Sequence, residues 1–185
     1  MSALTTAAPM EAKSSKGLPE GDGWWFEPKW DGFRCLAFRS GDQLELVSKS
    51  GKSLNKFFPE VVERLKALPQ QRFGLDGELL AQDGSDWSFE VLQARLPPAP
   101  SRIHRLSLET PATLVLFDML VDVDGGDIRR EPLKVRQARL AAFADEIDSP
   151  KLTISGHSRE SARRNLAGRG PSGRRRRQTP GRPLP

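Results

Sequence analysis

One lysine, Lys29, stands in an aromatic setting that favours reactivity over simple solvation. Five aromatic residues occur within ten positions around it: Trp24, Trp25, Phe26, Trp30 and Phe33. A lysine that is partly desolvated and close to another cation, here Arg34, gives up its proton more readily and becomes a nucleophile. Gly32 lets the backbone approach a ligand closely. The segment therefore predicts a pocket walled by aromatic rings with covalent chemistry at Lys29, and an exposed loop lysine is the plain alternative.

Charged residues also occur in three later segments: Ser48–Lys52, Leu75–Leu79 and Leu116–Leu120. Phosphoryl transfer requires an in-line nucleophile, positive charge near the phosphate and a metal that eases the leaving group. Lys29 supplies the nucleophile and Arg34 part of the positive charge. An acidic residue at a strand end, such as Glu78, suits the metal.

The pattern Lys29-x-Asp31-Gly32-x-Arg34 resembles the nucleotidyl-transfer motif of the covalent nucleotidyltransferases, which are DNA ligases, RNA ligases and mRNA capping enzymes. The three later segments follow in the family's order and resemble the segment after motif I, motif III and motif IIIa. Connecting pieces resemble the minimal bacterial ATP-dependent DNA ligases: Pro9-Met10, Phe57–Glu60, Phe89–Leu96 and Pro132-Leu133. The resemblance covers about residues 9–165.

The resemblance implies a reaction in which Lys29 attacks the α-phosphorus of ATP, with Mg²⁺ as the metal. Pyrophosphate leaves, and AMP remains on the lysine as a phosphoramidate. The AMP then passes to the 5′-phosphate of nicked double-stranded DNA, and a 3′-hydroxyl displaces it. The implied function is therefore that of an ATP-dependent DNA ligase adenylation domain, acting in DNA repair or recombination.

The resemblance also assigns roles to five side chains besides Lys29. Glu27 faces the adenine edge, and Phe117 stacks on the adenine ring. Arg34 contacts the ribose or the nick phosphate, and Glu78 binds the ribose or helps to place the metal. Lys49 stands where Arg is usual, so it reaches DNA phosphate as a point charge without a bidentate fork.

Each of these residues also has a plain structural interpretation. Asp-Gly pairs are typical of turns, so Asp76-Gly77-Glu78 fits a turn. Phe117 fits the core, where most Phe residues of apolar strands lie, and Asp118 fits the cap of a loop. Taken singly these alternatives are favoured, whereas the ordered set beside Lys29 favours the site.

Two later motifs of the family have no counterpart in this sequence. They are the Glu-Gly-x-x-x-Lys strand (motif IV) and the Lys-x-Lys strand (motif V), and no lysine follows Lys151. The oligonucleotide-binding (OB) domain is also missing. The resemblance stops near Arg163-Arg164, which fits a truncated or frameshifted gene. Because lost positive charge at the α-phosphate slows such reactions by orders of magnitude, we expect a C-terminally truncated ligase with impaired activity.

The strands that position these motifs follow from the hydrophobic pattern. Alternation over residues 33–38 and a second strand at 44–49, joined by the turn 40–42, predict a β-hairpin. Further strands are predicted at 73–81 and at 112–121, the latter buried on both faces.

Three helices are predicted between and after these strands. The first begins at Pro59 and presents an apolar stripe: Val61, Val62, Leu65 and Leu68. The second is short and is marked by three apolar residues: Phe89, Leu92 and Leu96. The third begins at Pro132 and presents one apolar face: Leu133, Leu140, Phe143 and Ile147.

This mixture predicts an α/β (α+β) domain over residues 23–155. A flexible segment at 1–22 precedes it, and a disordered Arg/Gly/Pro-rich tail at 156–185 follows it. The resemblance implies a partial nucleotidyltransferase domain, ATP-grasp-like with antiparallel sheets.

The charge separates the tail from the body. Of the net +5 of the 185 residues, residues 156–185 carry +8 and the rest −3. The single Cys35 excludes an intrachain disulfide, and two histidines leave too few soft ligands for structural zinc. No apolar run approaches the ~18 residues of a membrane span, and residues 1–16 lack a signal-peptide core. We therefore expect a cytoplasmic monomer that does not bind membranes.

Two other functions fit parts of the sequence. The Lys-x-Asp-Gly motif alone fits an RNA ligase or a capping-type nucleotidyltransferase. The arginine-rich tail fits a non-catalytic remnant that binds nucleic acid electrostatically and in a salt-dependent way.

Overall fold

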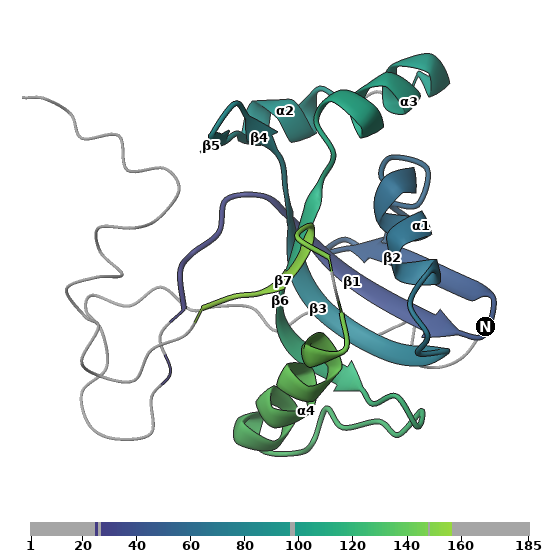
Figure 1. Ribbon diagram of the computed structural model, residues 1–185, viewed down its shortest axis with the longest axis vertical. Coiled ribbons are helices and arrows are strands. Elements are labelled where there is room, and N and C mark those ends of the chain that lie inside the picture. Colours follow the sequence, from purple (N-terminus) through teal and green to yellow (C-terminus); the bar gives the residue numbers. More distant parts are fainter. Residues whose placement is uncertain (1–24, 26, 97–98, 148, 157–185) are drawn as a thin grey trace, which may run out of the picture.

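The computed structural model describes residue 25 and residues 27–96, 99–147 and 149–156. Its centre is a five-stranded sheet in the order β2-β1-β3-β6-β7 (Figure 1). The strands are β1 (Phe33–Ser40), β2 (Gln43–Ser48), β3 (Arg72–Leu80), β6 (Thr113–Val121) and β7 (Leu152–Ile154). Every neighbouring pair is antiparallel except β6 and β7, which are parallel.

Four helices and a small hairpin surround this sheet. The helices are α1 (Pro59–Lys66), α2 (Phe89–Gln93), α3 (Pro100–Glu109) and α4 (Leu133–Asp145). The hairpin pairs β4 (Gln82–Asp83) with β5 (Asp86–Trp87). In Figure 1, α2 and α3 lie together at one end of the molecule, and α4 lies at the other.

The core lies on one face of the sheet, between the strands and two helices. Val61 and Leu65 of α1 and Leu140 and Phe143 of α4 belong to the same buried cluster as alternate residues of the strands. The opposite face of the sheet carries a smaller apolar cluster: Leu36, Phe38, Val47 and Val121. This second face has less apolar cover, and polar side chains share it.

The predicted mixed α/β class, the antiparallel pairing and the order of the predicted elements are confirmed. Three elements were not predicted: α3, the β4–β5 hairpin and β7. Pro100 occupies the first turn of α3, where its missing N–H needs no partner.

Two predicted apolar faces were wrong in detail. Leu96 lies beyond the end of α2 and is 47% exposed. Leu133 is 39% exposed, whereas Arg136 and Gln137 are buried on α4 because they find polar partners below the helix.

The predicted segment 1–22 lies outside the described residues, as does the predicted tail 156–185 apart from residue 156. Among the described residues, no helix is long and apolar enough to cross a membrane.

Candidate active site

Neighbouring strands bring the predicted site residues together. Arg34 of β1 pairs in register with Glu78 of β3, and Glu78 pairs with Val115 of β6. Cys35 and Ala37 belong to the core, so the alternation of β1 directs Arg34 to the opposite face. The site therefore lies on the face away from the main core, where the loop carrying Lys29 enters β1.

A β-bulge in β6 determines where Phe117 and Asp118 lie. Asp76 pairs with Asp118 and Gly77 pairs with Leu116, so Phe117 is an extra residue without a partner on β3. The bulge shifts the alternation, and Met119 rather than Asp118 joins the core. Phe117 and Asp118 are thus both kept out of the main core.

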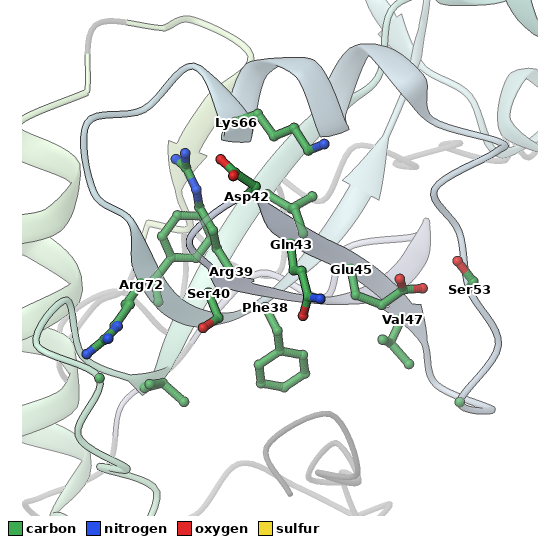
Figure 2. A pocket seen from close by; sticks show the side chains of 15 residues that line it. Phe38, Arg39, Ser40, Asp42, Gln43, Glu45, Val47, Ser53, Lys66 and Arg72 are labelled. Atoms are coloured by element: carbon green, nitrogen blue, oxygen red, sulfur yellow. The ribbon is translucent and has the colours of Figure 1, made fainter. Parts of the chain in front are cut away.

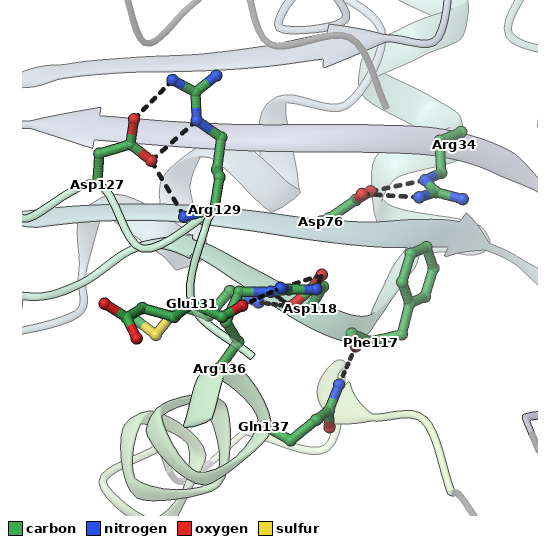
Figure 3. A network of polar contacts seen from close by, with 10 residues as sticks. Arg34, Asp76, Phe117, Asp118, Asp127, Arg129, Glu131, Arg136 and Gln137 are labelled. Carbon is green, nitrogen blue, oxygen red and sulfur yellow. Dashed lines mark hydrogen bonds and ion pairs between the residues drawn. The ribbon is translucent and has the colours of Figure 1, made fainter. Parts of the chain in front are cut away.

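Arg34 is held in one position by a carboxylate and an aromatic ring. Its Nε donates to Asp76 Oδ1 at 2.6 Å and its Nη2 to Asp76 Oδ2 at 2.7 Å. Its guanidinium carbon lies 4.3 Å from the centre of the Phe117 ring (Figure 3). Burial raises the pKa of Asp76, and the Arg34 charge opposes this shift. One face of Phe117 is therefore covered by Arg34, and the predicted stacking on adenine has to use the remaining face or displace Arg34.

Helix α4 holds the bulge through two polar side chains. Arg136 forms a fork with Asp118, with Nε 2.9 Å from Oδ1 and Nη2 2.8 Å from Oδ2 (Figure 3). Gln137 donates to the carbonyl of Phe117. The pair with Asp118 raises the pKa of Arg136, so this cation stays charged in the interior. The sequence interpretation missed both residues, because their burial depends on the strand beneath α4 and not on a local pattern.

The loop before β1 is fixed on both sides of Asp31. The Gly32 amide donates to Glu78 Oε1 at 3.1 Å, and the Trp30 indole donates to Ser155 Oγ at 2.9 Å. Lys29 and Glu27 are exposed. The predicted nucleophile is thus open to solvent, on a short loop whose following residues are fixed.

The prediction of an aromatic pocket around Lys29 is wrong for Phe33. Trp30 packs edge-on against Trp87, with ring centres 6.3 Å apart. Phe33 instead packs against Phe58 and Phe89 beside the main core, because β1 alternation places it on the same face as Cys35. Trp24 and Phe26 lie outside the described residues.

Two carboxylates of the site have strongly perturbed pKa values. Loss of water raises the pKa of Glu78 to about 7, while Arg34 and the Gly32 amide oppose the shift. Loss of water, followed by the Asp118 charge, raises the pKa of Glu27 to about 7. Burial is therefore the main cause of both shifts, and it favours the neutral form of each carboxyl group.

The raised pKa of Glu78 predicts that the stability of the fold depends on pH. The pKa of Glu78 is raised from 4.5 to about 7 in the folded chain, so the linked stability is fully present below about pH 4.5 and is lost as pH rises through 7. We expect the urea midpoint to fall between pH 5 and pH 8, and Glu78→Gln to flatten that fall. Glu63→Gln, an exposed carboxylate on α1, is the matched control and should leave the slope unchanged. An equal slope in wild type and Glu78→Gln would contradict the prediction.

The structure also gives the positions of Lys49, of Asp76-Gly77-Glu78 and of Asp118. Lys49 follows Ser48, which pairs with Cys35, so it lies at the Arg34 end of β1. Asp76-Gly77-Glu78 belongs to β3, so the turn interpretation is wrong. Asp118 lies within β6 and pairs with Arg136, so the loop-cap interpretation is also wrong.

A pocket of about 830 Å³ lies at the other end of the hairpin, around the β1–β2 turn (Figure 2). Its wall mixes three cations with two acids: Arg39, Lys66, Arg72, Asp42 and Glu45. Neither Lys29 nor any other predicted site residue lines it. The chemistry predicted from the sequence belongs to the Lys29 end of the sheet.

Residues 7–160 match the family model described as the ATP dependent DNA ligase domain. DNA ligase C of Mycobacterium tuberculosis is 39% identical over 137 residues, which cover 74% of this chain and 37% of that protein. DNA ligase C1 of Mycolicibacterium smegmatis is 40% identical over 144 residues, covering 74% and 40%. The chain thus spans about two fifths of the length of these relatives.

Solved structures show the same fold. The ligase domain of M. tuberculosis LigD superimposes with a TM-score of 0.56 at 26% identity, covering 74% of this chain and 41% of that one. A mycobacterial DNA ligase D complexed with ATP gives a TM-score of 0.55 at 26% identity, covering 72% and 40%.

Proposed function

The chain belongs to the ATP-dependent DNA ligase family, and on that premise we propose that it transfers AMP from ATP to Lys29. One observation carries the proposal: the loop with the exposed Lys29 leads into β1, where Arg34 pairs with Glu78 and lies over the ring of Phe117. These are the residue types that covalent nucleotidyl transfer uses. The family match favours this proposal over an RNA ligase or capping enzyme.

The proposed step forms one bond and breaks one. The Lys29 amine, after losing a proton to solvent, attacks the α-phosphorus of ATP and forms a P–N bond. The bond between that phosphorus and pyrophosphate breaks, and the pyrophosphate takes the electron pair. Arg34 neutralises charge on the bound nucleotide, Phe117 offers a ring face to adenine, and Glu27 faces the adenine edge.

Glu78 is suited to a divalent cation delivered with the nucleotide. Among the described residues no group of three or more ligating side chains gathers, so the chain offers no all-protein cage. Mg²⁺ instead binds through one or two carboxylates together with substrate phosphates and water, which fits Glu78. Burial raises the pKa of Glu78, and a cation beside it would favour the charged carboxylate. Bound there, Mg²⁺ would supply charge neutralisation on the phosphates.

We further propose nicked double-stranded DNA as the acceptor of the AMP. Lys49 lies at the Arg34 end of the hairpin, where a 5′-phosphate can approach the site. A single ammonium there contributes a salt-dependent contact without base specificity.

Incubation with ATP labelled at the α-phosphate, with and without Mg²⁺, tests the proposal. We expect Mg²⁺-dependent label that survives a denaturing gel and maps to the Lys29 peptide. The yield should lie below one AMP per chain, because no lysine follows Lys151 to neutralise the α-phosphate. Lys29→Ala should carry no label, and Lys134→Ala, which removes an exposed lysine of α4, should label normally. Absence of label in the wild type, label retained in Lys29→Ala, or a preference for GTP would overturn the proposal.

A further inference from the structure

Trp30, the residue after Lys29, contacts two other parts of the chain. Its indole N–H donates to Ser155 Oγ at 2.9 Å, across 125 positions of sequence. Its ring packs edge-on against Trp87 of β5 at 6.3 Å between centres. Together, the hydrogen bond and the ring contact fix the orientation of the indole. The residue next to the predicted nucleophile is therefore one of the most constrained in its loop.

Ser155 is itself fixed to the strand that presents Phe117. It is only 2% exposed, and its own amide donates to the Leu116 carbonyl at 2.6 Å. Leu116 precedes the bulged Phe117 and pairs with Gly77, the neighbour of Glu78. The hydroxyl that receives the indole is thus tied to the same two strands that carry the other site residues.

The β4–β5 hairpin completes this junction. Gln82 of β4 pairs with Trp87, and Gln82 Oε1 also accepts from Lys151 Nζ at 3.3 Å just before β7. The hairpin and the β7 segment are therefore linked to each other as well as to Trp30. We call the contacts of Trp30 with Ser155 and Trp87 the Trp30 anchor.

We propose that the Trp30 anchor positions Lys29 for AMP transfer, with Ser155 as the positioning residue. The role in transfer rests on the proposed function, whereas the fixing of the loop does not. A second fixed point is the Gly32 amide, which donates to Glu78 three positions after Lys29. Without the indole bond, Lys29 swings about that point, and misplacing a nucleophile by about 1 Å lowers rates by up to ~100-fold.

Three variants and one control test the proposal in the full chain. Ser155→Ala removes the acceptor, Trp30→Phe removes the donor but keeps a ring against Trp87, and a double variant combines them. Ser107→Ala is the matched control, because it also removes a buried hydroxyl bond, to the His104 carbonyl, but on α3 away from the loop. Hydrogen exchange of the peptide 27–33 and the rate of Lys29 labelling at varied ATP are measured for each.

We expect exchange of the peptide 27–33 to accelerate about tenfold in each single variant, and Ser107→Ala to leave it unchanged. At saturating ATP, labelling should slow about tenfold with little change in the ATP concentration for half-maximal rate. The double variant should equal the singles, because they break one bond. Unchanged exchange, a loss confined to ATP affinity, or additive losses would overturn the proposal. If the wild type takes no label, the proposed function fails, and the exchange data still decide whether Ser155 fixes the loop.

Discussion

Replacing Gly32 by alanine is expected to lower Lys29 labelling about 100-fold while leaving most of the fold intact. A methyl group at this position would lie 2.1 Å from the Leu79 carbonyl oxygen and 2.7 Å from Leu80 Cδ2. The first contact is with the backbone of a central strand, so it cannot be relieved by turning a side chain. The loop must lift away from β3, and the hydrogen bond from the Gly32 amide to Glu78 breaks with it.

The expected loss comes from geometry rather than from unfolding. Lys29 and Glu78 are placed relative to each other through this close approach of two backbones, and effective positioning contributes several powers of ten to such reactions. The urea midpoint should fall only modestly, since overpacking at a loop that can move costs about 1–3 kcal/mol.

The matched control is Gly156→Ala, because a methyl group there meets no atom within 4 Å and the backbone has no left-handed φ. Labelling and urea melts are measured for both variants. Labelling of Gly32→Ala within about threefold of the wild type would contradict the prediction.

The order of the motif-like segments and their resemblance to a known family carried most of what could be predicted about the site. Arg34 and Glu78 lie on predicted strands, and their pairing follows once β1 and β3 are neighbours. The chemistry proposed for Lys29 follows from the resemblance of its motif. These motifs are short and continuous in the chain, so they can be recognised without the fold.

The features that the sequence did not predict depend on non-local pairing. The bulge that turns Phe117 toward Arg34 is defined by its register with β3, about forty positions earlier in the chain. The burial of Arg136 depends on Asp118 lying beneath α4. Ser155 gains its role only when β7 lies beside β6. No local pattern distinguishes such residues from ordinary polar ones.

The sequence around Arg95 does not indicate its structural role. Of the substitutions considered, its replacement should lower the stability of the fold most. It follows α2 and is 0% exposed. Its guanidinium lies 2.8 Å from Glu60 of α1 and 4.8 Å from the centre of the Phe58 ring. It also donates to three carbonyls, those of Phe57, Leu106 and Thr110. One side chain thus joins α1, α3 and the segment after α2.

Arg95→Met is expected to lower the free energy of unfolding by about 3–5 kcal/mol, because it leaves the Glu60 carboxylate in a site without its partner charge. That is a large share of the ~5–15 kcal/mol typical of a domain. Urea melts measure it, with Arg105→Ala as control: Arg105 forms an exposed pair with Glu109 and should change stability by less than about 0.5 kcal/mol. A change below about 1 kcal/mol in Arg95→Met would contradict the prediction.

A double variant distinguishes the cost of the unpaired Glu60 carboxylate from the cost of the contacts that Arg95 loses. Glu60 Oε1 also accepts from the Ala112 amide at 3.0 Å, and the amide oxygen of glutamine can keep that bond. Arg95→Met with Glu60→Gln should therefore recover about 1–2 kcal/mol relative to Arg95→Met alone, because no buried charge is left unpaired. If the double variant is no more stable than the single one, the guanidinium stabilises the fold through its carbonyl bonds and its contact with Phe58, and the carboxylate is a minor partner.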